Sequence, residues 1–201
     1  MSRRPSSREI ALEDELQLKR QRDFRAAADA VAAALTSFAE VEKIALFGSA
    51  ARPLLREVPR FQPFRQFGIE LLHECKDADL AVWLSCTDRL RDLGRARNQA
   101  VSQLHATTGV GVAHHQIDVF LLACKDRRYL GRLCCFAACP KQKPECLVPG
   151  CGATPFLRQH EGFKLFSNAL SDENARVLFD RQAGIQDVAA ELEPQPGAGT
   201  A

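Results

Sequence analysis

The sequence predicts an α/β (α+β) fold in which helices flank a small mixed sheet. Three stretches near residues 43–47, 79–84 and 115–122 are short, apolar and strand-like. Helix-like apolar stripes precede the first stretch and separate the second from the third. Because strands and helices that alternate along a chain pack as layers, we expect a layer sandwich, and 201 residues are enough to build its core.

The composition is that of an ordinary globular protein, with 46% apolar and 26% charged residues. The net charge of +2 creates no strong basic field, so charge gives no support for a nucleic-acid partner and leaves that question open. All apolar runs fall short of the ~20 residues of a membrane span, and the N-terminus has no signal-peptide core. We therefore expect a cytoplasmic protein without a membrane partner.

The N-terminal part of the chain predicts a long helix over residues 6–40. Ser6-x-x-Glu9 is a capping-box pattern, which marks the start of a helix. The first half is charged on most sides, so we expect a solvated surface, with a nucleic-acid contact as the alternative. In the second half, apolar residues recur every three or four positions, which indicates a buried helix face: Phe24, Ala28, Val31, Leu35 and Phe38.

Residues 41–47 predict a buried strand that ends in a turn at Gly48 and Ser49. Gly48 allows a ligand to approach the backbone, and a helix beginning at Ala50 would point free N–H groups at a phosphate. Pro53 and Pro59 limit that helix to a short one. Alone, a Gly-Ser pair is weak evidence for a phosphate site, because most such pairs are plain turns.

Residues 79–84 alternate as a strand does, with Asp79, Ala81 and Trp83 on one face. Asp77, two residues earlier, shares that face. Thr87 is expected to cap a helix that ends before Gly109, and its inward positions are Leu90, Leu93, Val101 and Leu104. The strand over 115–122 follows and carries Asp118.

Gly48-Ser49, Asp77-x-Asp79 and Asp118 therefore occur in this order within residues 41–122. The set resembles the signature of the nucleotidyltransferase superfamily named after DNA polymerase beta. In that family a Gly-Ser turn is followed by two aspartates on one strand and a third carboxylate on a neighbouring strand. The resemblance implies a nucleotidyltransferase-type mixed sheet in a domain over residues 6–128.

The resemblance implies an enzyme that transfers a nucleoside monophosphate from an NTP to a hydroxyl of a protein, a small molecule or an RNA end. Asp77 and Asp79 would bind two Mg²⁺ ions, and Asp118 would hold the catalytic ion and help deprotonate the acceptor. Gly48 and Ser49 would hold the β,γ-phosphates.

Two further considerations bear on this candidate site. Plain surface aspartates are the alternative to a metal site, but carboxylates set into apolar strands are costly without a cation. Lys76 is a candidate phosphate contact, with a solvated side chain as the alternative.

The spacing between Ser49 and Asp77 is 27 residues (50–76), which is longer than is usual in the family. We therefore interpret residues 53–73 as an insertion rich in arginine and phenylalanine. It is either a basic, aromatic lid over a nucleotide or a surface loop that packs its phenylalanines on the domain. The surface loop is the favoured interpretation.

A cysteine cluster in residues 134–151 predicts a structural zinc site. Cys135-x₃-Cys139 and Cys146-x₄-Cys151 have spacings common among zinc ligands, and four thiolates would staple a loop-rich segment. Two residues are reserve ligands: Cys134 and His160. The alternatives are reduced cysteines without metal, or a redox pair.

Residues 129–192 are expected to form a Cys-rich segment and a last helix, packed on the same domain. Ser171-Asp172-Glu173-Asn174 would start this helix, with Ala175, Leu178 and Phe179 facing inward. Residues 193–201 are rich in Pro, Gly and Ala and are expected to be disordered.

Two functions fit these patterns. The first is a Mg²⁺-dependent nucleotidyltransferase whose substrates are an NTP and a hydroxyl acceptor. The alternative is a non-enzymatic, zinc-stapled interaction module on a nucleotidyltransferase-like scaffold. The three aspartates favour the enzyme, since an interaction module has no need of them.

Overall fold

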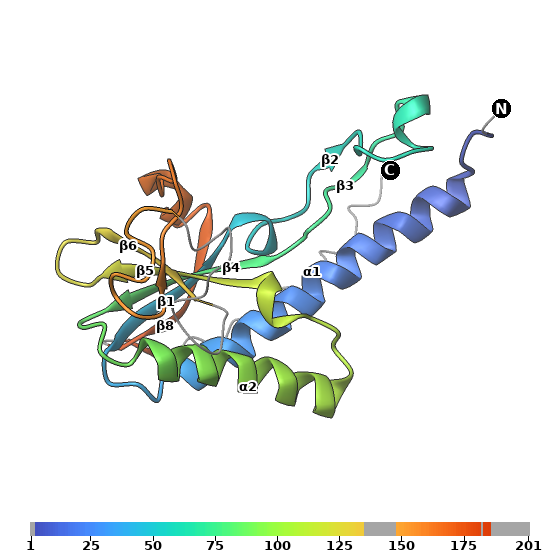
Figure 1. The fold of residues 1–201 in the computed structure, drawn as a ribbon. Helices are drawn as coiled ribbons and strands as arrows, with labels where there is room; N and C mark the ends of the chain where they lie inside the picture. The colour runs from blue at the N-terminus through green and yellow to red at the C-terminus, as the bar shows by residue number, and fades with distance from the viewer. Residues whose placement is uncertain (1–2, 135–147, 182, 186–201) are drawn as a thin grey trace.

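The computed structural model describes residues 3–134, 148–181 and 183–185. Within them, seven strands form one mixed sheet: β1 (Val41–Phe47), β4 (Ala78–Leu84), β5 (Ile117–Ala123), β6 (Tyr129–Leu133), β7 (Leu157–Arg158), β8 (Ala175–Asp180) and β9 (Gly184–Ile185). The strand order is β7-β6-β5-β4-β1-β8-β9. Two helices, α1 (Ser7–Leu35) and α2 (Leu90–Thr108), lie on one face of the sheet (Figure 1). The predicted α/β class is confirmed.

The three predicted strands are neighbours at the centre of this sheet. β1 pairs with β4 in the antiparallel sense, and β4 pairs with β5 in the parallel sense. A parallel pair needs a crossover, and α2 provides it between β4 and β5. The parallel register places Asp79 opposite Asp118.

The main core lies between the helices and one face of the sheet. Leu80, Val82 and Leu84 of β4 are buried there, whereas Ala81 and Trp83 belong to a smaller apolar cluster on the other face. The alternation predicted for residues 79–84 is therefore confirmed. On α2, Leu90, Leu93 and Val101 are buried, and the helix ends at Gly109, whose φ is 74°.

α1 begins as predicted but ends earlier than expected. The Ser6–Glu9 capping box is formed. The helix stops at Leu35 rather than at residue 40, because the next two hydroxyls bond to nearby backbone carbonyls. Thr36 Oγ1 donates to the Ala33 carbonyl at 2.8 Å, and Ser37 Oγ donates to the Ala34 carbonyl at 2.9 Å. Such local bonds compete with continuation of the helix.

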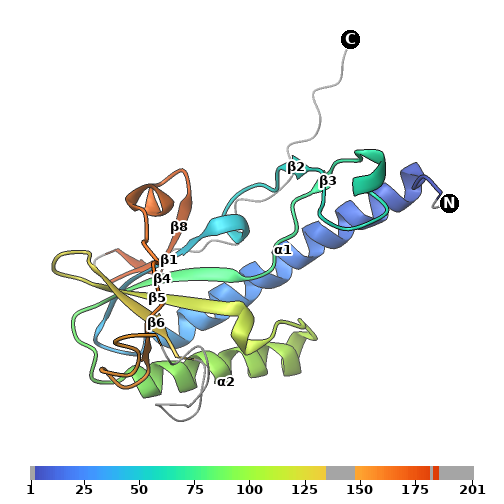
Figure 2. The same ribbon diagram turned by 45° about the horizontal axis from the view of Figure 1, so that its top comes forward.

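Residues 53–73, interpreted above as an insertion, form a separate ribbon along the N-terminal half of α1, beyond the sheet (Figure 2). It contains the short strands β2 (Arg56–Glu57) and β3 (Leu71–Leu72) and the 3₁₀ turn η2 (Arg65–Phe67). Phe64 is 8% exposed in a cluster with Ile69 and Leu71, against which Ile10 of α1 and Phe67 pack. Phe64 and Phe67 thus pack on the protein, as the surface-loop interpretation expects, whereas Phe61 is 40% exposed.

The predicted C-terminal helix is wrong, because residues 175–180 form strand β8. This strand pairs with β1, whose second edge would otherwise be open. Ser171 and Asn174 form a turn instead of a helix cap, and the Asn174 N–H donates to the Ser171 carbonyl at 2.9 Å. Leu178 and Phe179 still face the core, as predicted, but from a strand.

Candidate metal centre

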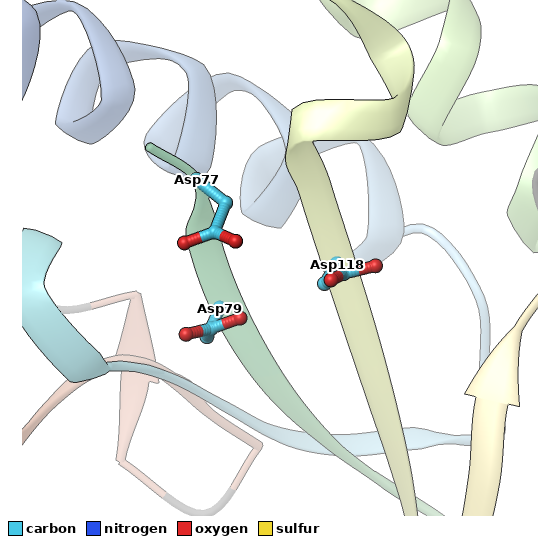
Figure 3. Close-up of side chains that lie close together, drawn as sticks. All are labelled: Asp77, Asp79 and Asp118. Carbon is cyan, nitrogen blue, oxygen red and sulfur yellow. The ribbon is translucent and has the colours of Figure 1, made fainter. Parts of the chain in front are cut away.

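Three carboxylates converge at the start of β4 and β5 (Figure 3). Asp79 lies on β4, Asp77 immediately precedes that strand, and Asp118 lies on β5. One carboxylate oxygen of each residue lies within 4.8 Å of the others, and all three side chains are half-buried. This cluster could hold a metal ion, since hard divalent cations prefer carboxylate oxygens.

Strand geometry explains why the three side chains meet. Residues two apart on a strand point to the same face, so Asp77 and Asp79 lie side by side. The parallel register then sets Asp118 directly beside Asp79 on the neighbouring strand. All three lie on the sheet face opposite the helices, next to the smaller apolar cluster.

Gly48 lies against the cluster, immediately after β1. Its φ is +77°, a left-handed conformation that side chains rarely adopt. A Cβ atom at this position would lie 2.7 Å from Asp79 Oδ2. Glycine is therefore required here both for the turn and for the close approach of the backbone to Asp79. The helix expected from Ala50 is only the single 3₁₀ turn η1 (Gly48–Ala50).

Burial and repulsion within the cluster raise the pKa of two of its members. Burial, together with the charges of Asp77 and Asp118, raises the pKa of Asp79 from 3.8 to about 7. Burial and the charge of Asp118 also raise the pKa of Asp77. A cation placed among the three groups would relieve both the burial cost and the repulsion.

Asp79 should therefore make the metal-free protein less stable as the pH rises. The pKa of the Asp79 carboxyl is 3.8 in the unfolded chain and about 7 in the native protein, so between these pH values the native state binds the proton more tightly. The free energy of unfolding therefore falls as the pH rises through this window. We expect Asp79→Asn to be more stable than wild type above about pH 7, by on the order of 1–3 kcal/mol, and to match it near pH 4. Urea unfolding in EDTA across this range tests this, and a constant difference between the two proteins would contradict it.

The carboxylates line a cleft of about 600 Å³ on the sheet face opposite the helices. One wall is the sheet itself, including Phe47, Phe120 and Arg132. The other wall is the segment 162–169, which contributes Phe163, Lys164 and others. The cleft thus has room for a small molecule beside the three carboxylates.

Arg132 of β6 is part of this site and did not appear in the sequence prediction. Its Nη1 donates to Asp118 Oδ2 at 2.5 Å, and its guanidinium lies over the Phe120 ring, 4.3 Å from the centroid. Strand pairing places Arg132 opposite Phe120, two residues beyond Asp118. One sequence signal could have predicted the β5–β6 hairpin that brings Arg132 here: a polar turn at residues 125–128 lies between two apolar stretches.

Ser49 and Lys76 lie near the carboxylates, but neither side chain points to a defined phosphate position. Ser49 Oγ lies 3.1 Å from Cys75 Sγ, so its hydroxyl contacts a buried thiol. Lys76 is 68% exposed, with its Nζ 3.7 Å from Glu74 Oε2. Its charge nonetheless acts on Asp77, whose pKa it lowers against the effect of burial.

Most of the predicted zinc site lies outside the described residues, namely Cys135, Cys139 and Cys146. Cys151 is half-buried with a free thiol, and Cys134 is buried beside β7, where its N–H donates to the Phe156 carbonyl at 2.8 Å. His160 is half-buried, and its Nδ1 has no partner among the described residues. Cys134, Cys151 and His160 thus lie at the β6–β7 edge of the sheet.

Comparison with family models, curated proteins and solved structures gives no match. Within the described part of the chain, neither helix has an apolar stretch long enough to cross a bilayer.

Proposed function

We propose that the protein is a Mg²⁺-dependent nucleotidyltransferase that transfers a nucleoside monophosphate from an NTP to a hydroxyl acceptor. The observation that carries the proposal is the convergence of Asp77, Asp79 and Asp118 within 4.8 Å, in an open cleft beside a glycine turn. The order of these motifs along the chain, which resembles the DNA polymerase beta superfamily, is a second support.

In the proposed reaction, the acceptor hydroxyl attacks the α-phosphorus of the NTP. A bond forms between the acceptor oxygen and the α-phosphorus, the bond to the bridging oxygen breaks, and pyrophosphate leaves. The hydroxyl proton passes to Asp118, the carboxylate nearest β6. Asp118 Oδ2 is held by Arg132, which fixes the orientation of the carboxylate in the cleft.

Two bound Mg²⁺ ions would neutralise charge on the entering and leaving oxygens of this reaction. Asp77 and Asp79 would bind both ions, and Asp118 would bind the one on the acceptor side. The residues fit hard cations, because they offer only carboxylate oxygens. Burial and the charges of the two neighbouring carboxylates raise the pKa of Asp79, and a bound cation would offset both effects. Gly48 and Ser49, after β1, would lie beside the β,γ-phosphates.

The direct test is incubation of the purified protein with each labelled NTP and Mg²⁺. We expect release of pyrophosphate that requires the divalent metal, with label transferred to an added acceptor or to the protein itself. The absence of metal-dependent pyrophosphate release with all NTPs and a broad set of hydroxyl acceptors would contradict the proposal.

We also propose a structural zinc ion, held by Cys135, Cys139, Cys146 and Cys151, with Cys134 or His160 as the reserve ligand. The support is the ligand spacing in the sequence. We expect about one zinc per chain in freshly purified, reduced protein, and a lower melting temperature after chelation. Elemental analysis tests this, and a zinc-free preparation with an unchanged melting temperature would remove the proposal.

A further inference from the structure

Unpartnered polar atoms are concentrated at one edge of the sheet, beside the cleft. In the described residues, six side-chain nitrogen or oxygen atoms are covered from solvent and have no hydrogen bond of ordinary length and angle, and four of the six lie on β6, on β7 or just after it. These four are Tyr129 Oη, Arg132 Nε, Arg158 Nε and His160 Nδ1. Covered polar atoms without hydrogen-bond partners are rare in folded proteins, so four of them in one place need an explanation, and a bound ligand that supplies the missing partners is one.

The four side chains lie close together. Arg132 and Arg158 are paired neighbours on antiparallel strands and therefore share a face. The Phe163 ring lies among the other groups: its centroid is 5.1 Å from that of Tyr129 and 6.2 Å from that of His160. The Arg132 guanidinium carbon is 5.6 Å from the same centroid.

The chemistry of this cluster favours an anion. An arginine Nε can only donate a hydrogen bond, and a tyrosine hydroxyl can donate one. Arg158 makes no ion pair within the described part of the chain, and Arg132 makes one, to Asp118. Burial and the charges of both arginines lower the pKa of His160, so the local field is positive.

The position of the cluster distinguishes it from the expected NTP phosphates. Gly48 and Ser49 follow β1, on one side of the carboxylates, whereas the cluster lies on β6 and β7, on the other side. Asp118, on β5, stands between them, and Arg132 is the member of the cluster that contacts it. An anion bound by the cluster would therefore approach the reacting atoms from the acceptor side.

We propose that Arg132, Arg158, Tyr129 and His160 form a binding subsite for a phosphate group of the acceptor. The proposal rests on the proposed function and names its acceptor class: a hydroxyl compound that carries a phosphate close to the reacting oxygen. Arginine suits this task because its planar fork matches the geometry of a phosphate.

The first experiment measures binding of inorganic phosphate by calorimetry, without Mg²⁺ and without NTP. We expect wild type to bind phosphate and Arg158→Gln to bind it about tenfold more weakly, the loss of one charge-assisted contact. Arg158→Lys keeps the charge and should retain part of the affinity. Arg95→Gln, at an exposed position on α2 across the sheet, is the matched control and should behave as wild type. Equal phosphate affinity of wild type and Arg158→Gln would overturn the subsite.

The second experiment separates acceptor phosphate from NTP phosphate. A non-hydrolysable NTP analogue with Mg²⁺ should leave the Arg158-dependent phosphate binding intact, whereas competition would assign the cluster to the NTP and overturn the proposal. Because the first titration needs neither metal nor turnover, its result is independent of the transfer assay. Nucleotidyl transfer without Arg158-dependent phosphate binding would sink only the subsite, and the reverse result would sink only the proposed reaction.

Discussion

Asp79→Asn and Asp118→Asn are each expected to lower the rate of nucleotidyl transfer by about 10³-fold or more. Asparagine keeps the shape of the side chain and removes the charge that would hold a divalent cation beside the α-phosphate. The loss should appear in kcat, because catalysis of this kind depends mainly on positioning and on stabilisation of charge in the transition state. Single-turnover transfer rates with saturating NTP and Mg²⁺ measure it.

Stability separates this effect from unfolding. In EDTA at neutral pH, Asp79→Asn should melt no lower than wild type, since the substitution removes a buried charge that two neighbouring carboxylates repel. Asp172→Asn is the control, because Asp172 is an exposed aspartate outside the cluster. It should transfer at the wild-type rate. Near-native transfer by Asp118→Asn would show that Asp118 is not the third carboxylate.

The centre of the fold was predictable because its signals are local. The period-two alternation of residues 79–84 and the helical stripe of α2 each lie within one element. That Asp118 lies on a strand next to the one carrying Asp79 was expected from the family resemblance, and the parallel register of β4 and β5 sets the two residues opposite each other. Three site residues thus followed from short patterns and their order.

The edges of the sheet were not predictable in the same way, because long-range pairing determines them. Residues 175–180 contain both helix-compatible and strand-compatible side chains, and it is the free edge of β1 that makes them a strand. Arg132 enters the site through pairing of β6 with β5, and the segment containing Phe163 enters by crossing the open face. Propensity within a single segment carries no information about such partners.

Gly48→Ala is expected to lower transfer by about 10²-fold while costing only about 1–2 kcal/mol of stability. The stability cost arises from φ = +77°, which alanine adopts with strain. The larger effect on rate arises from the new Cβ atom, 2.7 Å from Asp79 Oδ2. The carboxylate is the end of a side chain that can turn, so the overlap is relieved by rotating Asp79 away from Asp77 and Asp118. A small displacement of that kind is enough to spoil the positioning of a metal and an α-phosphate.

Gly68→Ala is the matched control for this variant. Gly68 also has a positive φ, +60°, but nothing lies within 4 Å of the position that its Cβ would take. Both alanines therefore pay a similar backbone cost, and only the one at position 48 meets Asp79. We expect both variants to lose a similar amount of stability in urea unfolding. Only Gly68→Ala should keep the wild-type transfer rate and the wild-type affinity for Mn²⁺, which serves as a probe for the metal site. If the two variants transfer equally well, the orientation of Asp79 does not depend on Gly48, and the close approach of the turn to the carboxylates has no part in the reaction.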